Sequence, residues 1–406
     1  MASNYPNFRR SVPWLILFLE VVFIIFTYIL PSDDEVSLLS VTYPAFQDVN
    51  HMLILGFGFF LICLRRYGFS GAGFNLLIIA LGVQCSMLIE DVLFFYLGSQ
   101  YEDTMRKMTK AAVSMTAVVI STGAVLGKTN PVQLILMTIV EIIVFYISRW
   151  MNSRFLQIAG NMTVMHVHLF GAYFGLAVSS RFPKPALRSE KNASTPKSDL
   201  LSMLGTLFLW IFWPGFNSAL AESRSRAVYN TYFALAVSAV TAFVLSVLTT
   251  KDGRFRMTHI RSAVLAGGVT AGFVADSVEH PWIAMILGLL ASVIAVLGSY
   301  CLQGCLHPAL KIHDTAGVHF TFGLPGVLGA LAQVILLAIK EWATMPRLAE
   351  LVVNHIGACC LTISVALITG LITGLILNLK LFKTVPVSKY FDDQFYWEFP
   401  HLAVGF

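Results

Sequence analysis

Charged residues are scarce in this sequence. Only 12% of its 406 residues are aspartate, glutamate, lysine or arginine, whereas 57% are hydrophobic, and the mean hydropathy is +0.74. A water-soluble domain carries about twice that share of charged residues. The composition therefore predicts a polytopic membrane protein. The net charge of +5 does not indicate a nucleic-acid partner, because the basic residues lie in short loops rather than on one face.

Cysteine is also scarce, and catalytic patterns are absent. The six cysteines all lie in or beside apolar segments, so they indicate neither a disulfide framework nor a zinc site. No nucleophile–base pair and no metal-ligand spacing occurs. We therefore expect no enzymatic activity, no catalytic residue, no metal and no cofactor. The first apolar segment lacks a small-residue cleavage pattern after it, which favours a retained span.

What the sequence does contain is long apolar segments. A bilayer-spanning helix needs about 17–25 residues, and twelve segments meet that length. They lie near 14–30, 45–64, 74–97, 111–127, 131–149, 159–180, 199–220, 228–249, 260–276, 281–301, 315–339 and 351–377. We expect an all-α transmembrane domain over 1–378, followed by a cytoplasmic tail over 379–406.

Loop charge predicts the orientation of these spans. If the N-terminus is cytoplasmic, 18 of the 27 lysines and arginines lie on the cytoplasmic side. Basic loops are retained in the cytoplasm. Twelve spans then place both termini there, as in a multi-pass protein of the plasma membrane.

The segment 161–178, NMTVMHVHLFGAYFGLAV, carries two histidines in an apolar helix. An ionisable residue within a membrane span is costly and indicates a functional site. His168, Gly171 and Gly175 share one helix face, and small residues let a second backbone approach closely. His166 lies about 200° around the helix from His168, so the two cannot chelate one metal.

The segment 314–330, DTAGVHFTFGLPGVLGA, repeats this pattern. His319, Gly323 and Gly326 again share a face. Each histidine alone is equally compatible with a core residue bonded to a carbonyl. Two histidines beside glycines favour a shared polar site between two packed helices. Glu141, in the middle of another span, is either a buried structural group or an acceptor for exposed helix N–H groups beside a pathway.

His168 lies in the sixth expected span and His319 in the eleventh, so the two spans differ by five, an odd number. Their helices therefore run in opposite directions. Two five-helix units of inverted orientation, with the site at their interface, produce this arrangement. The first span then lies outside the repeat as an extra N-terminal helix.

Several motifs resemble one known family, the Rh family of ammonium-transporter-like proteins. The motifs are HLFGAYFGLAV at 168–178, AVLGK at 124–128, GTLFLWIFWPGFNSA at 205–219, NTYF at 230–233, AVLAGGV at 263–269 and HDTAGVHFTFGLPGV at 313–327. The ending KYFDDQFYWEFPHLAVGF is similar to blood-group Rh polypeptides of the D/CE type, whereas the middle is closer to Rh-associated glycoproteins.

The resemblance implies a trimer with one narrow hydrophobic pore in each subunit, through which ammonia, and in some members carbon dioxide, passes. It implies that His168 and His319 are the twin pore histidines and that Phe216 is the inner of two gate phenylalanines. By the same resemblance, two family features are absent. Val113 occupies the position of the family's outer gate phenylalanine, and Gly160 occupies the position of its buried aspartate.

Three hypotheses follow. The first is a weak channel for neutral ammonia, since an apolar pore with two neutral histidines excludes ammonium through its desolvation cost. The second is a non-conducting structural subunit of a red-cell membrane complex, forming a homotrimer or a heterotrimer with an Rh-associated glycoprotein, with its tail bound to a cytoskeletal adaptor such as ankyrin. The third, an ion-coupled transporter, lacks a coordinating acid–hydroxyl cluster.

Overall fold

A computed structural model describes residues 8–29, 43–97, 104–185, 190–302, 312–340 and 345–399. These residues form helices and loops, and they form no strand. The helices of the bundle are α1 (Phe8–Ile29), α2 (Tyr43–His51), η1 (Met52–Phe57), α3 (Gly58–Phe60), α4 (Gly68–Leu97), α5 (Thr104–Val125), α6 (Pro131–Leu156), α7 (Gly160–Met165), α8 (Val167–Ser179), α9 (Pro196–Ser218), α10 (Arg224–Thr249), α11 (Met257–Ala271), α12 (Pro281–Leu297), η3 (Gly298–Leu302), η4 (His319–Gly323), α14 (Leu324–Lys340) and α15 (Met345–Leu377). Four short segments, η2 (Glu190–Asn192), η5 (Lys380–Phe382), η6 (Val387–Lys389) and η7 (Asp393–Phe395), lie in a loop and in the tail.

Ten helices of the described part are each long and apolar enough to cross a membrane. They correspond to ten of the twelve expected spans. The segment expected at 45–64 is helical but divided among α2, η1 and α3, and the segment expected at 260–276 forms the 15-residue α11 followed by turns. The all-helical prediction is therefore confirmed, and two of the spans are shorter or more irregular than an even bilayer crossing.

Among the described residues, three segments are π-helical: η1, η3 and η4. A π-helical turn changes which side chains face a neighbour, and such turns occur often at functional sites. A further break at His166 divides the expected span 159–180 into α7 and α8. Two of these interruptions, at His166 and at η4, lie beside the predicted site histidines.

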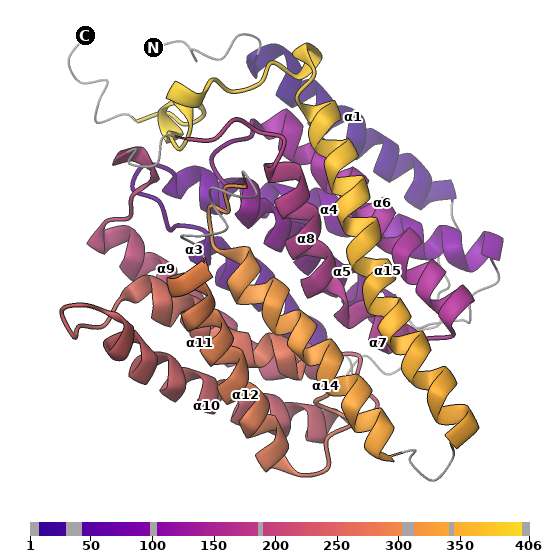
Figure 1. Ribbon diagram of the computed structural model, residues 1–406. Coiled ribbons are helices and arrows are strands. Elements are labelled where there is room, and N and C mark those ends of the chain that lie inside the picture. The colour runs from indigo at the N-terminus through magenta and orange to yellow at the C-terminus, as the bar shows by residue number, and fades with distance from the viewer. Residues whose placement is uncertain are drawn as a thin grey trace.

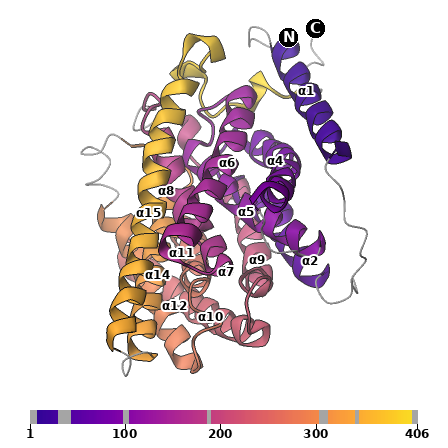
Figure 2. The ribbon, with the colours of Figure 1, turned by 90° about the vertical axis from the view of Figure 1, so that its right-hand side faces the viewer.

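The longest helix, α15, crosses the outside of the bundle and packs on α8, α6 and α14 (Figure 1). In the view turned by 90°, α1 stands at the edge of the molecule beside α4 (Figure 2). Its side chains are mostly apolar and exposed; Trp14 is 68% and Phe18 is 64% exposed. An apolar helix with such exposure is suited to contact with lipid.

The tail turns back onto the bundle after α15, and it lies at the same end of the molecule as the start of α1 (Figures 1 and 2). The Asp393 carboxylate accepts hydrogen bonds from the backbone N–H groups of Phe69 and Ser70, both at 2.8 Å. Trp397 donates to the Ser70 hydroxyl at 2.9 Å. The tail up to residue 399 therefore caps the first turn of α4, while residues 1–7 and 400–406 lie outside the described residues.

Candidate functional site

His168 is completely buried on α8 among aromatic rings. Its imidazole stacks on Trp213 at a centroid distance of 5.7 Å and on Phe322 at 6.3 Å, and it lies 5.8 Å from the ring of Phe216. Neither ring nitrogen has a hydrogen-bond partner. Because a buried polar atom without a partner costs free energy, such an atom in a native structure calls for a functional explanation.

His319 lies on the π-helical segment η4, which packs against α8. Its ring lies edge-on to Tyr173 at 6.0 Å, and its Nδ1 also has no hydrogen-bond partner. Its backbone N–H donates to the Asp314 carboxylate at 2.9 Å, together with the N–H groups of two preceding residues. Asp314 therefore fixes the start of η4, and no hydrogen bond joins the two imidazoles.

Contacts at the two ends of α8 define an axis along this helix and through the site. Met165 and Gln333 lie at one end of this axis, where both line a small pocket. Ser179 and the backbone of His313 lie at the other end, where the Ser179 hydroxyl donates to the His313 carbonyl at 2.7 Å. The two histidines lie between these ends, on elements that run in opposite directions.

The glycines of the two predicted stripes occupy different contacts. A Cβ on Gly171 would lie 2.3 Å from the Ala117 carbonyl oxygen, and one on Gly175 would lie 2.5 Å from the Ser121 Cα. These two glycines therefore bring α8 against α5. Gly323 faces Ala172 and Tyr173, and Gly326 faces Leu169, so the second stripe packs on α8 itself.

The three remaining predicted positions lie in different environments. Phe216 on α9 is buried, and its ring lies 5.8 Å from the imidazole of His168 and 6.2 Å from the ring of Trp213. Val113 on α5 is buried in the hydrophobic core. Gly160, the first residue of α7, is exposed, and a Cβ there would meet nothing within 4 Å.

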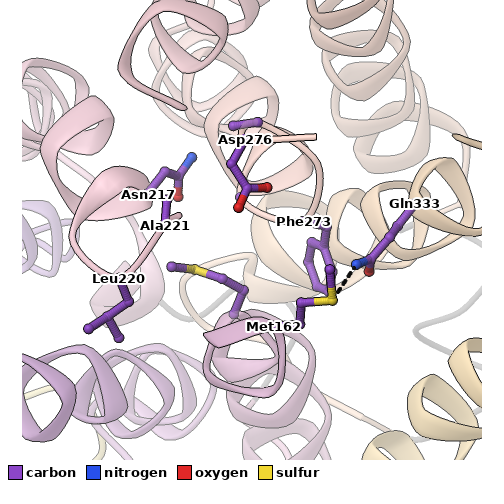
Figure 3. Close-up of a pocket in the computed structure, with 10 residues that line it drawn as sticks. Met162, Asn217, Leu220, Ala221, Phe273, Asp276 and Gln333 are labelled. Carbon is purple, nitrogen blue, oxygen red and sulfur yellow. Dashed lines mark hydrogen bonds between the residues drawn. The ribbon is translucent and has the colours of Figure 1, made fainter. Parts of the chain in front are cut away.

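Figure 3 shows the pocket at the Met165 end of the axis, a cavity of about 20 Å³. Met162, Asn217, Phe273 and Asp276 contribute to its wall, and the Gln333 amide donates to the Met162 sulfur at 3.2 Å. The carbonyl oxygen of the Asn217 side chain has no partner. The volume suits one water-sized molecule, and the acceptors suit a small hydrogen-bond donor.

Two polar residues of the spans have structural partners. His166 bonds through Nδ1 to the Thr362 hydroxyl at 2.9 Å, and its ring lies 5.7 Å from Phe273. It therefore points away from His168, as the helical spacing indicates. Glu141 accepts a hydrogen bond from the Ser121 hydroxyl. This partner is a side chain. No hydrogen bond from a backbone N–H to Glu141 is present among the described residues, so the second alternative, an acceptor for exposed helix N–H groups, has no support from these contacts.

A buried lysine that the sequence pattern did not indicate, Lys128, lies at the opposite end of the axis. The Lys128 ammonium donates to the Ser179 hydroxyl and to the His313 carbonyl, each at 2.6 Å. Burial lowers the pKa of Lys128 from 10.5 to about 7, while the nearby Asp314 carboxylate opposes that shift. A lysine in a short loop is ordinarily a solvated cation, and nothing in the local pattern AVLGKTNP indicates that this one is buried.

The backbone around Lys128 is also closed by the tail. Gly127 has φ of +77°, and its carbonyl accepts from the Phe391 N–H at 3.0 Å. A Cβ on Gly127 would lie 2.3 Å from the Phe391 ring. Only glycine meets both demands, so residues 127 and 391 hold the tail over this end of the axis.

Comparison with known proteins finds relatives that match the whole chain. A model of the Ammonium Transporter Family matches residues 14–393. An RH-like protein of Macaca mulatta is 42% identical over 417 residues, and the human blood group Rh(CE) polypeptide is 41% identical over 419 residues, with all of both chains covered in each case.

The solved structure of Rh50 from Nitrosomonas europaea, described as one of the Rhesus protein family of channels, has a similar fold. Its TM-score is 0.77 and its identity 30%, and the match covers 90% of this chain and 94% of Rh50. The helical architecture thus has a counterpart among solved structures over nine-tenths of this chain.

Proposed function

The chain belongs to the Ammonium Transporter Family, and we propose that it is a weakly conducting channel for neutral ammonia. The observation that carries this proposal is the unpartnered imidazole of His168 between Trp213, Phe216 and Phe322. A neutral imidazole supplies one donor and one acceptor. Ammonia passing between these rings satisfies both nitrogens in turn.

The same environment selects against the cation. Ammonium leaving water at His168 meets aromatic and apolar side chains and no carboxylate that would offset its lost hydration. Ammonia carries no charge and loses far less. Carbon dioxide, also small and uncharged, is the second candidate gas. In this proposal His319 is the second pore histidine, beside Tyr173.

The small pocket lined by Asn217, the residue that follows Phe216, is the proposed outer mouth. Position 160 holds glycine, so no buried carboxylate stands there to organise a cation. Asp276 lines the pocket and is half-buried, so it is the carboxylate that a cation entering this pocket would meet. With Val113 in place of an outer gate ring, Phe216 alone closes the mouth. Recruitment of ammonium is therefore weak, and flux follows the concentration of the neutral species.

Trimeric assembly and location are further parts of the proposal. We propose a location in the plasma membrane with both termini in the cytoplasm, because 18 of the 27 lysines and arginines then lie on the cytoplasmic side. A homotrimer, or a heterotrimer with an Rh-associated glycoprotein, is the expected assembly. The apolar outer faces of α1 and of α10, where Val240 and Leu248 are exposed, offer surface for lipid or neighbouring subunits.

A second function, a structural subunit without conduction, is supported by the closed packing of His168. Its side chain is 0% exposed, and the family resemblance implies an aspartate and a gate phenylalanine at the positions that Gly160 and Val113 occupy here. A cytoskeletal adaptor such as ankyrin would then bind the cytoplasmic tail.

Ammonia entry into proteoliposomes separates these functions. Vesicles containing only this chain are diluted into an ammonium salt, and internal alkalinisation is followed. The channel proposal predicts faster alkalinisation than in protein-free vesicles and a loss of that excess in His168→Phe. A rate equal to that of protein-free vesicles would favour the structural subunit.

A further inference from the structure

A second cavity lies against the tail and shares no lining residue with the small pocket around Asn217 and Asp276. It measures about 720 Å³, within the ~300–1,000 Å³ typical of small-molecule sites. Its walls come from the loop before α4, the first turn of α9 and the tail. We call this cavity the basic pocket, because Arg65, Arg66 and Lys197 line it.

The acidic side chains of the basic pocket are already engaged. Asp393 accepts the N–H groups of Phe69 and Ser70, and Asp392 pairs with the Lys191 ammonium at 3.1 Å. Arg65, Arg66 and Lys197 are exposed, and none of them pairs with a carboxylate in the part of the chain that the structure describes. Three cations therefore face the pocket with no anion committed to them.

Aromatic rings form the remaining wall of the pocket. Phe69 is 60% exposed and lies 5.4 Å from the ring of Phe399 and 6.2 Å from that of Trp397. Trp397 is held in place by Ser70 and by Gly73, where a Cβ would lie 2.4 Å from the indole. These contacts fix the position of Trp397 in the wall.

The pocket lies at the depth of a membrane surface. The spans Gly68–Leu93 and Pro196–Ser218 both begin at its rim. Exposed aromatic residues at such a level are typical of the interface between hydrocarbon and water. If the tail is cytoplasmic, as proposed above, the pocket faces the leaflet that carries anionic lipids.

We propose that the basic pocket binds the phosphorylated headgroup of an inositol lipid of the cytoplasmic leaflet. Arginine guanidinium groups bind phosphate oxygens in pairs, and lysine adds a point charge. The volume admits a sugar-sized ring, and the aromatic wall lies where the acyl chains leave the headgroup. This inference depends on the proposed orientation and not on ammonia conduction.

Native mass spectrometry of the full chain tests this inference. The protein is titrated with phosphatidylinositol 4,5-bisphosphate, with phosphatidylserine, and with soluble inositol trisphosphate as competitor. We expect one tightly bound phosphoinositide per chain and weaker binding of phosphatidylserine. Replacing Arg65, Arg66 and Lys197 by glutamine should weaken phosphoinositide binding by at least about tenfold.

A matched triple variant serves as the control. Lys251, Arg254 and Arg256 lie exposed in the loop between α10 and α11, on the same predicted side, and their replacement by glutamine should change binding less than about twofold. Lys197→Gln alone, at an exposed position, covers the case in which the triple variant does not fold, and should weaken binding about threefold.

Equal losses in both triple variants would show attraction by net charge and overturn the inference. Stronger binding of soluble inositol trisphosphate than of the lipid would also overturn it, because the ligand would then be a free phosphate. Neither readout involves transport, so failure of the ammonia proposal leaves this test unaffected.

Discussion

At the scale of single residues, the two histidines and the glycines beside them have separate tasks. Gly171 and Gly175 bring the backbone of α8 onto α5, which fixes the depth at which His168 lies between its aromatic neighbours. The side chain of His168 contributes no hydrogen bond to the fold. The free energy lost by burying its two unpartnered nitrogens must therefore be offset by the packing of the surrounding side chains.

Gly175→Ala should destabilise the protein by about 2 kcal/mol, because the new methyl group would overlap the Ser121 backbone and force α8 away from α5. Gly160→Ala is the matched control, since its methyl group meets nothing within 4 Å, and it should be neutral or slightly stabilising. The midpoint of thermal unfolding in detergent measures both. Equal midpoints in the two variants would show that the close α5–α8 approach is not required.

Gly160→Asp should increase ammonia entry if a carboxylate at the mouth is the missing feature. The position is exposed at the start of α7 and has room for the side chain, so the fold should tolerate it. We expect a several-fold higher initial rate of internal alkalinisation at low pH, where ammonium predominates. Gly160→Asn is the uncharged control, and an equal gain in that variant would attribute the effect to size rather than charge.

Part of the candidate site could be predicted from the sequence. His168 and His319 were singled out as polar residues in apolar spans, and Phe216 by the resemblance to the family; their role in a pore stays a prediction. The rings of Trp213 and Phe322 around His168 could not be predicted, because each lies on a different helix and an aromatic residue in a span is normally core. The burial of Lys128 also depends on contacts from residues 179 and 313, far away in the sequence.

At the scale of elements, the interruptions of the helices matter most. Hydropathy predicted twelve helical segments, and each of the twelve regions contains helix, although the helix ends at Phe60 in the second and at Ala271 in the ninth. It did not predict η1, η4 or the break at His166, because apolar composition is insensitive to a change in backbone hydrogen bonding. These irregular turns are buried in protein, where neighbouring groups satisfy the backbone; the Asp314 carboxylate does so for the start of η4.

The end of α5 provides a pH-dependent test. The pKa of Lys128 is lowered from 10.5 to about 7 by burial, so between these values the unfolded chain holds a proton that the folded chain has lost. The cost of burying the ammonium is present below pH 7 and is relieved as pH rises. Stability should therefore increase by about 2 kcal/mol between pH 7 and pH 9.

Lys128→Met should remove this increase, whereas Lys251→Met, in an exposed loop, should retain it. Chemical or thermal unfolding at both pH values measures the difference. A parent protein whose stability is unchanged, relative to Lys128→Met, would show that the amine keeps its ordinary pKa.

At the scale of the whole molecule, the orientation follows from the partition of basic residues. We expect peptide tags before Met1 and after Phe406 to be inaccessible to antibody on intact cells and accessible after permeabilisation. The start of α1 and the tail lie at one end of the bundle (Figure 2), so both tags should behave alike. Labelling of the C-terminal tag on intact cells would reverse the assignment of the basic pocket to the cytoplasmic leaflet.

The central claim is that a closed aromatic site around His168 passes a neutral molecule and rejects its cation. The most direct measurement records ammonia entry and membrane current together, in planar bilayers and vesicles containing only this chain, at fixed total ammonium over a range of pH. Flux should rise with pH in proportion to neutral ammonia, with no current above that of protein-free membranes. A saturable inward current that is largest at low pH would contradict the account.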